Sequence, residues 1–503
     1  MGIRAGARES VPRVSATIYP SIAAAVAHAK RTARSPLVFD PAEHLLARLS
    51  FGATSADRSF VAERGLQGWF DHQVALGRAH PGYGANPHVA KQGPLLAMNP
   101  YDVATWLTDH GNEYGWDAMD QLTQVTLGLQ AYSPAQFYET LVDFFANHLN
   151  VPNHNGDLWN VRHTFDRDVI RRHALGSFSD MLLAAAKHPA MLLYLNLAES
   201  TKTLVNENYG RELLELHTVG LRYTESDVKN TARLLTGRTV DDNAHYVYDD
   251  YIHATGPIKV LGFTSANASA AGGEAAGDAL LRYLAKHRYT AQHLAQKLCV
   301  HYVSDTPSAS LVNAVAKSYL DHDTKILPTV ETILRSDEFW QSRGLKVRRP
   351  AEHLIASVRA LDLGVSDWSK ALDSLHWMSE SVGHAPLDWP APNGYPDVAS
   401  AWRSAGTLLR EWNYNLGFAG GWWDGFAKLP TSRLYPPGTA TSGDAIDQLT
   451  RRVTGTAFSS SDRAALQTFL GEGAGTALHD STLRWLVEPL TALVLDGPHH
   501  ALR

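Results

Sequence analysis

The chain has 503 residues, of which 44% are hydrophobic and 19% charged, an ordinary composition for a soluble globular protein. Its formal net charge of −6 argues against a general nucleic-acid-binding protein. The single cysteine, Cys299, excludes an intramolecular disulfide and a zinc site built on several thiolates.

Residues 1–35 are predicted to form an N-terminal extension. Their apolar patch at residues 22–27 is too short for the core of a secretory signal peptide. The sequence contains no run of about 18 apolar residues, so no membrane span is predicted. We therefore expect a cytoplasmic protein, or an exported one if a leader was removed upstream of this numbering.

Helical periodicity dominates the rest of the chain. The stretch 176–197 is expected to form two helices with a break near Pro189, because proline removes a backbone donor. The stretch 223–237 is expected to begin with a capping pair, Thr224 and Asp227. Further helices are predicted at 41–54, 133–149, 289–305, 327–340 and 349–361.

Strand signals are confined to one region. The stretches 245–253 and 258–263 are predicted to pair as one hairpin, and 264–277 to be a surface loop. Prolines make 384–397 irregular. The expected fold class is mainly α: a large multi-helix globular domain with a small β excursion near 245–263. We expect a main helical domain at 36–427, a connector at 428–444 and a C-terminal helical segment at 445–503 packed on the main domain.

The stretch "NENYGRELLELHTVG" (206–220) contains three glutamates, one arginine, two asparagines and a histidine. Asn206 is the expected N-cap of its helix. On a regular helix the carboxylates share one face and His217 lies on the apolar face. One interpretation is a solvated helix with ion pairs, each contributing about 0.2–0.5 kcal/mol. The other is that Glu212 and Glu215, one turn apart, converge to share a proton or to bind a divalent cation.

Polar and aromatic residues elsewhere complete the candidate site. The segment "DFFANHLNVPNHN" (143–155) supplies helix-end polar groups, including His154. The predicted catalytic residues, also the predicted ligands of a divalent metal ion, are Glu212, Glu215 and His148. The predicted substrate contacts are Asn147, Asn206, Asn208, Arg211, Trp389 and Tyr395. The residues predicted to orient them are Asp143, His188 and His217.

Several common catalytic signatures are absent. The sequence has no phosphate-binding G-x-x-x-x-G-K-[ST] loop and no G-x-G-x-x-G after a strand. It also lacks a G-x-S-x-G elbow and an H-E-x-x-H helix. These absences disfavour a nucleotide hydrolase, a Rossmann dehydrogenase, an α/β-hydrolase and a zincin, but not enzymes in general.

Six stretches recur in an order that resembles one bacterial family. They are "HLLARLSFGAT", "FFANHLNV", "DRDVIRRHALGSFSDMLLAAAKHPAMLLYL", "NENYGRELLELHTVG", "YTESDVKNTARLLTGR" and "PAPNGYPDVASAW". Together they resemble the family catalogued as the domain of unknown function 1800, over roughly residues 40–503. The resemblance implies one long helical domain. It assigns no reaction and no catalytic residue.

Three functional hypotheses follow. The first is a carboxylate- or metal-dependent hydrolase acting on a polar small molecule or a glycan, with a divalent metal ion as the cofactor that the carboxylates would suit. The second is a non-enzymatic binding or assembly protein, in which the charged helix is an interface. The third is an oxidoreductase containing iron or haem, because histidines are plentiful. No nucleic-acid partner and no membrane span are expected.

Overall fold

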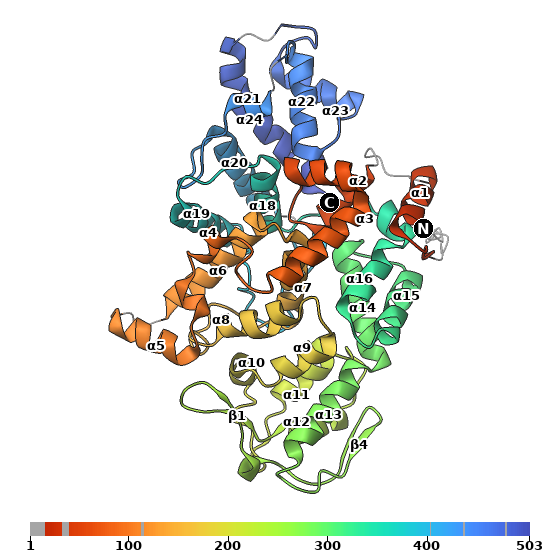
Figure 1. Cartoon of the computed structure of the whole chain (residues 1–503), viewed down its shortest axis with the longest axis vertical. Helices are drawn as coiled ribbons and strands as arrows, with labels where there is room; N and C mark the ends of the chain where they lie inside the picture. The colour runs from red at the N-terminus through yellow and green to blue at the C-terminus, as the bar shows by residue number, and fades with distance from the viewer. Residues whose placement is uncertain (1–15, 33–39, 112–114, 403, 436–437, 478–479) are drawn as a thin grey trace, which may run out of the picture.

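The computed structural model describes residues 16–32, 40–111, 115–402, 404–435, 438–477 and 480–503 (Figure 1). Over these ranges helices predominate and the strands form two small two-stranded sheets, which confirms the predicted mainly α fold. Of the predicted extension, residues 1–15 and 33–35 lie outside the described residues. The N-terminal elements are α1 (Ile22–Thr32), α2 (Pro41–Leu49), α3 (Ser55–Ala79), α4 (Pro87–Ala90), the 3₁₀-helix η1 (Pro94–Ala97), α5 (Pro100–Asp109) and α6 (Trp116–Tyr132).

The middle of the chain contains two π-helical segments, η2 and η3, each continuing a short α-helix. The predicted break at Pro189 is confirmed, since α9 ends and α10 begins there with His188 as its N-cap. The elements are α7 (Gln136–His148), α8 (Arg162–Phe165), η2 (Asp166–Arg171), α9 (Phe178–Ala185), α10 (Pro189–Tyr194), α11 (Asn208–Glu212), η3 (Leu213–His217) and α12 (Glu225–Leu235).

Local side-chain caps decide where two of these helices begin. The predicted capping pair of α12 is confirmed: the Thr224 hydroxyl accepts from the Asp227 amide, and the Asp227 carboxylate accepts from the Thr224 amide. The predicted N-cap Asn206 is wrong by one residue, because α11 begins at Asn208 and Glu207 is its N-cap. Asn206 still satisfies a terminal donor, since its side-chain oxygen accepts from the Asn208 amide at 2.9 Å.

The β excursion consists of two hairpins, which corrects the prediction of one. Strand β1 (Arg238–Val240) pairs with β2 (Tyr246–Tyr248), and β3 (Ile258–Val260) pairs with β4 (Phe263–Ser265), both antiparallel. A 3₁₀-helix, η4 (Asp250–Ile252), follows β2. Leu261 and Gly262 both have positive φ, the conformation that closes a two-residue hairpin, so β3 turns back on β4 and does not pair with β2. The predicted loop 264–277 is correspondingly shorter.

The C-terminal half is a succession of helices. Among the described residues, none of the helices combines the length and apolar character needed to cross a bilayer. The predicted connector 428–444 contains α21 and the start of α22. The helices are α13 (Gly273–Ala285), α14 (Arg288–Tyr302), α15 (Ala309–Asp321), α16 (Ile326–Leu334), α17 (Asp337–Gln341), α18 (Pro350–Ala360), α19 (Trp368–Ser381), η5 (Ala399–Ala401), α20 (Ala405–Gly420), α21 (Thr431–Leu434), α22 (Ser442–Thr454), α23 (Ser460–Leu470), α24 (Asp480–Asp496) and α25 (Pro498–Ala501).

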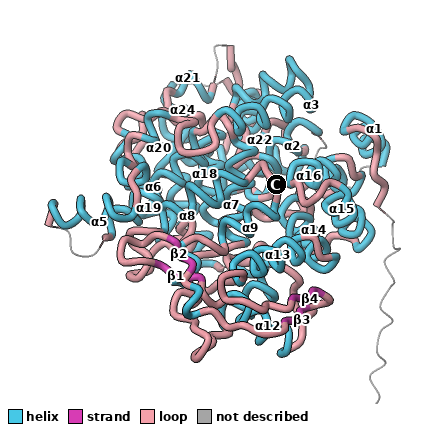
Figure 2. Tube along the Cα trace, turned by 60° about the horizontal axis from the view of Figure 1, so that its bottom comes forward, coloured by secondary structure: helices cyan, strands magenta, loops and turns pink. Residues whose placement is uncertain are grey.

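Two large hydrophobic clusters hold these helices together. One joins the N-terminal helices and α7 to α14–α17, and the other joins α6 and α18–α20 to α22 and α24. Figure 2 shows the two sheets at one end of the molecule beside α12 and α13. The irregular loop 382–398 lies between the clusters, because Leu387 packs against both. This loop therefore runs along the seam between the two halves of the core.

Candidate functional site

A cavity of about 310 Å³ opens along the seam, and we call it the Asp397 cavity. Helix α7 forms one wall and α14 another, while the 382–398 loop and Arg349, just before α18, close it. Its chemistry-bearing residues are Asp143, Asn147, Lys297, His301, Arg349, Trp389, Tyr395 and Asp397. Of the predicted site residues, Asp143, Asn147, Trp389 and Tyr395 are thus brought together around one hollow.

Asp397 is the centre of a largely buried ionic cluster. One carboxylate oxygen lies 2.6 Å from His301 Nδ1, and the other lies 2.9 Å from the Lys346 ammonium. Burial alone would raise the pKa of Asp397, but His301, Lys346 and Arg349 hold it well below its ordinary value. Asp397 is therefore ionised at neutral pH and fixes the orientation of the His301 ring.

The His301 ring has a second nitrogen, Nε2, which is buried and has no hydrogen-bond partner among the described residues. Because Nδ1 donates to Asp397 when the imidazole is neutral, Nε2 is then the proton acceptor. His301 lies one helical turn after Lys297 on α14, and both line the cavity. The Asp–His pair thus presents an oriented imidazole beside Lys297.

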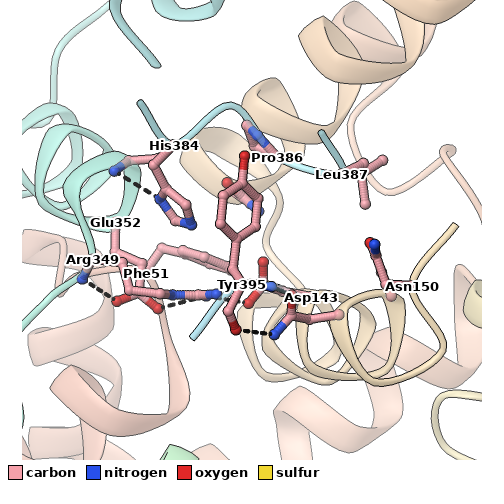
Figure 3. A pocket seen from close by; sticks show the side chains of 13 residues that line it. Phe51, Asp143, Asn150, Arg349, Glu352, His384, Pro386, Leu387 and Tyr395 are labelled. Atoms are coloured by element: carbon pink, nitrogen blue, oxygen red, sulfur yellow. Dashed lines mark hydrogen bonds and ion pairs between the residues drawn. The ribbon is translucent and has the colours of Figure 1, made fainter. Parts of the chain in front are cut away.

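A second ion-pair chain borders the cavity. Figure 3 shows Arg349 between Glu352 and Asp143, with the Tyr395 ring beside them. The Arg349 guanidinium pairs with Asp143 on α7 and lies 3.0 Å from Glu352, which also pairs with Arg503 at 3.2 Å. These contacts tie α7, the start of α18 and the C-terminus to one another. The predicted orienting residue Asp143 therefore positions Arg349 at the cavity wall.

Lys297 differs from every cation just described. Its partly buried amine lines the cavity and has no hydrogen bond or ion pair among the described residues. Burial lowers its pKa to about 8, and the more distant charge of Asp397 offsets this only in part. A lysine in this state is neutral in an appreciable fraction of molecules near neutral pH, so it can take up a proton.

The 382–398 loop is clamped onto the end of α7. The Asn147 side chain donates to the Tyr395 carbonyl at 2.9 Å and accepts from the Tyr395 amide at 2.6 Å. Gly394 has a φ of 70°, and an added Cβ would lie 2.2 Å from the Asn147 carbonyl oxygen, so only glycine fits this contact. The rings of Trp389 and Tyr395 pack 5.0 Å apart, centroid to centroid, on the cavity side. The loop thus presents a preformed aromatic wall.

The predicted acidic pair lies elsewhere, on the segment formed by α11 and η3. Glu212 and Glu215 are partly buried, and Tyr223 donates a hydrogen bond to Glu215. Burial, and then the charge of Glu215, raises the pKa of Glu212. Neither residue lines the Asp397 cavity. The Glu212 charge also raises the pKa of Tyr194, after burial, and the Tyr194 hydroxyl donates to the Pro390 carbonyl of the 382–398 loop.

The remaining predicted residues make local contacts. Arg211 forms ion pairs with Glu225 and Glu207, at 2.8 and 3.5 Å. Asn208 donates to the Leu195 carbonyl, and His188 caps α10. None of these contacts identifies a ligand, so their predicted roles at a site stay predictions, as do those of Glu212 and Glu215.

Three histidines, His148, His217 and His293, lie close enough to Lys297 for its charge to lower their pKa values. His148 Nε2 contacts the His217 carbonyl at 3.2 Å, and His293 Nε2 contacts the Leu216 carbonyl at 3.1 Å. Burial and then the Lys297 charge lower the pKa of His217 to about 3 and that of His293 to about 4. The pKa of His148 is lowered well below its ordinary value by the same causes. These three imidazoles are therefore neutral in the folded protein near pH 7.

This neutrality makes stability depend on pH. Consider a histidine whose pKa is near 6.5 in the unfolded chain and near 3 in the folded protein. It does not change the free energy of unfolding well above pH 6.5. At about pH 5, where only the unfolded chain is protonated, it lowers that free energy by about 2 kcal/mol. We expect the free energy of unfolding to fall between about pH 7.5 and about pH 5 in urea titrations. In a His217→Gln variant this fall should be smaller by about 2 kcal/mol. An unchanged pH dependence would show that folding does not lower the pKa of His217.

Sequence patterns did not identify four residues of the cavity: Lys297, His301, Arg349 and Asp397. Lys297 and His301 are one turn apart on a helix that the sequence predicted only as a helix. Asp397 lies at the end of the "PAPNGYPD" segment, so the only available signal was its position beside the predicted contacts Trp389 and Tyr395.

Comparisons with known proteins identify a family that covers nearly the whole chain, but they assign it no chemistry. The profile of the family described as "Protein of unknown function (DUF1800)" matches residues 44–502. No curated protein and no solved structure matches the chain significantly. The function therefore has to be inferred from the geometry of the chain itself.

Proposed function

This chain belongs to the DUF1800 family of proteins of unknown function, and we propose that it is a hydrolase that cleaves an ester bond of a polar substrate, such as an acylated glycan, in the Asp397 cavity. The observation that carries the proposal is the Lys297 amine, which faces the cavity without a partner among the described residues. Surface lysines extend into water, so an unpaired, partly buried amine beside a hollow is a candidate proton-transfer group.

In the proposed reaction, one residue of the cavity, Lys297, carries out both proton transfers that ester hydrolysis needs. Neutral Lys297 takes a proton from a water molecule as the water oxygen forms a bond to the ester carbonyl carbon. When the carbon–oxygen bond to the alcohol breaks, the Lys297 ammonium returns the proton to the leaving oxygen. Arg349 adds positive charge at the wall, where it favours the negative charge that develops on the carbonyl oxygen.

Asp397 and His301 act beside Lys297. Because Asp397 stays ionised, it is not the acid of the reaction; it orients His301 and limits how far the pKa of Lys297 falls. The His301 ring is fixed at the cavity wall by its contact with Asp397, while its Nε2 is buried. The two groups thus shape the wall and tune the base.

The lining favours a polar substrate with an apolar face. Trp389 supplies an indole ring, while Asn393 and Gln296 supply amides that can donate to and accept from hydroxyl groups. Sugar rings combine these two features, since their hydroxyls form hydrogen bonds and their C–H faces pack on aromatic rings. A glycan ester therefore fits the lining better than a purely apolar ester.

A second candidate is the acidic pair Glu212 and Glu215, as a carboxylate- or metal-assisted centre for the same kind of hydrolysis. The raised pKa of Glu212 favours it, because a carboxylic acid that keeps its proton can act as a general acid. The Tyr194–Pro390 hydrogen bond connects that surface to the loop of the Asp397 cavity.

Substrate screening tests the proposal. The purified chain is incubated with nitrophenyl esters, acylated sugars and glycosides, and we expect turnover of sugar esters. A Trp389→Ala variant should raise KM about 10-fold with a smaller change in kcat, since the ring binds ground state and transition state alike. Trp422→Ala, at a tryptophan that is 60% exposed, is the control and should change neither constant. Tight binding of acylated sugars without turnover would overturn the proposed hydrolase activity and would indicate a binding protein.

A further inference from the structure

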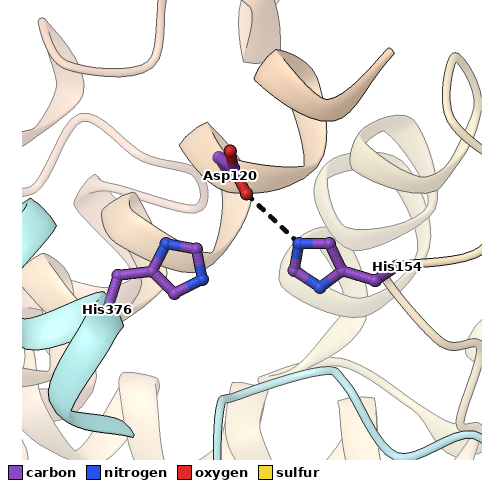
Figure 4. A group of neighbouring side chains, drawn as sticks. All are labelled: Asp120, His154 and His376. Atoms are coloured by element: carbon purple, nitrogen blue, oxygen red, sulfur yellow. Dashed lines mark hydrogen bonds and ion pairs between the residues drawn. The ribbon is translucent and has the colours of Figure 1, made fainter. Parts of the chain in front are cut away.

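A separate group of side chains lies beside Asp388 of the 382–398 loop. Asp120 of α6, His154 of the segment after α7 and His376 of α19 each offer one donor atom, and these three atoms lie within 4.8 Å of one another. Figure 4 shows the three side chains close together, with a His154 nitrogen joined to the Asp120 carboxylate. Helix α19, more than two hundred residues after His154, thus adds a second imidazole to the Asp120–His154 pair.

The spacing suits a small transition-metal ion. Two ligands bound to a tetrahedral ion at about 2.0–2.1 Å lie about 3.3 Å apart. Asp120 Oδ1 and His154 Nε2 are 3.2 Å apart, which matches such an edge. The donor atom of His376 lies within 4.8 Å of the other two donor atoms. Glu380, one turn further along α19, has a carboxylate oxygen 3.5 Å from His376 Nε2 and can supply a fourth ligand.

The outer contacts also resemble those of metal-binding histidines. Asp388 Oδ1 lies 3.0 Å from His154 Nδ1, so that Nδ1–H donates outward and Nε2 faces Asp120. A carboxylate behind a ligating imidazole fixes its tautomer and orientation at metal centres. His154 also lies against the Trp116 ring, which holds the imidazole in place.

An independent observation comes from His376. The residue is 8% exposed, and its buried Nε2 forms no hydrogen bond among the described residues, although the Glu380 carboxylate oxygen lies 3.5 Å away. A buried polar nitrogen with no partner is costly unless a ligand satisfies it. A metal ion between His376, His154 and Asp120 would do so.

We propose that Asp120, His154 and His376 bind one divalent transition-metal ion of the zinc class, with Asp388 supporting His154. Two imidazoles and a carboxylate are ligands that zinc accepts, and they are less suited to calcium or magnesium, which prefer oxygen. The ion braces the 382–398 loop, since Asp388 immediately precedes the cavity residue Trp389. This inference is independent of the reaction proposed for the Asp397 cavity.

Zinc binding to the full-length chain tests the site. After chelation and removal of the chelator, we expect titration calorimetry to detect one Zn²⁺ site. His376→Ala and Asp120→Asn should each weaken its affinity at least 10-fold, and Asp388→Asn about 10- to 100-fold. Zn²⁺ should also raise the melting temperature of the wild type but not that of His376→Ala.

The matched control is His245→Ala, since His245 is an exposed histidine 3.4 Å from Asp241. It should bind Zn²⁺ like the wild type. Co²⁺ substitution gives a second readout, because its visible spectrum reports imidazole ligation and should be lost in His376→Ala. Equal affinity in the wild type and the three site variants, or no binding by a correctly folded wild type, would overturn the proposal. Neither result bears on the activity of Lys297.

Discussion

Replacing Lys297 by methionine should lower kcat toward an ester substrate by about 10²- to 10⁴-fold, the usual contribution of a positioned general base. Methionine keeps much of the side-chain length and removes the amine. Because Lys297 has no ion pair among the described residues, its removal leaves no partner charge unpaired, and the fold should be retained. The measurement is steady-state kinetics on the best substrate, together with a urea unfolding curve.

The control for this variant is Lys259→Met, which removes an exposed lysine of β3 and should leave kcat unchanged. The pH profile adds a second check. The base works when neutral, so kcat/KM should rise with pH and level off above about 8. A Lys297→Met enzyme with wild-type kcat would contradict the proposal. If a Glu212→Gln, Glu215→Gln double variant lost activity instead, we would assign the catalytic residues to that acidic pair.

Replacing Arg171 by leucine should reduce the free energy of unfolding by about 3–5 kcal/mol, the largest stability effect that we expect from one substitution. The Arg171 guanidinium is fully buried and lies 2.8 Å from Asp166 and 3.0 Å from Glu139. Without it, the two buried carboxylates lose their only ion-pair partner among the described residues. They must then be protonated or hydrated, and either change destabilises the folded state.

Urea denaturation at neutral pH measures this loss. Arg463→Leu is the matched control, since Arg463 forms a comparable pair with Asp447 but both side chains are about one third exposed. Surface pairs of this kind contribute about 0–1 kcal/mol. A loss below about 1 kcal/mol for Arg171→Leu would mean that this part of the core tolerates two unpaired carboxylates, and that η2 is not held by its ion pairs.

Local sequence signals predicted the helices well because the interactions that define them are local. The proline at 189 and the Thr224–Asp227 cap act within a few residues, and the structure has helix boundaries at both positions. The loop 384–397 was predicted as irregular from its prolines alone, and it is irregular. Neither hairpin was predicted with its actual partners, because all four strands are three residues long and the turn of the second, Leu261–Gly262, lacks the usual Asn-Gly or Asp-Gly pair.

The π-helical segments show where periodicity fails. The predicted arrangement of residues 206–220 assumed a regular helix, but Leu213–His217 is π-helical, which changes the angles between successive side chains. Thr218 contributes to this geometry by donating to the carbonyl of Leu213, five residues earlier. Nothing in the sequence of this segment distinguishes a π-helical segment from an α-helical one.

Only some of the cavity residues could be predicted from the sequence, because the cavity is formed by segments that are far apart along the chain. Asn147, Trp389 and Tyr395 were identified from their types, but nothing linked α7 to a loop about 240 residues later. Lys297 and Lys346 look like ordinary lysines in the sequence, and they differ in the structure because Lys346 is paired with Asp397 and Asp305 while Lys297 is not paired. Such differences arise from tertiary packing, so one sequence cannot reveal them.

The proposed chemistry depends on Lys297 being an amine with a lowered pKa that faces the Asp397 cavity without a partner among the described residues. The titration of this one group can be followed by ¹³C NMR of reductively methylated lysines, with Lys297→Met used to assign the signal. We expect the Lys297 signal to titrate near pH 8 in the folded protein. Titration near 10.4, as for an ordinary exposed lysine, would contradict it.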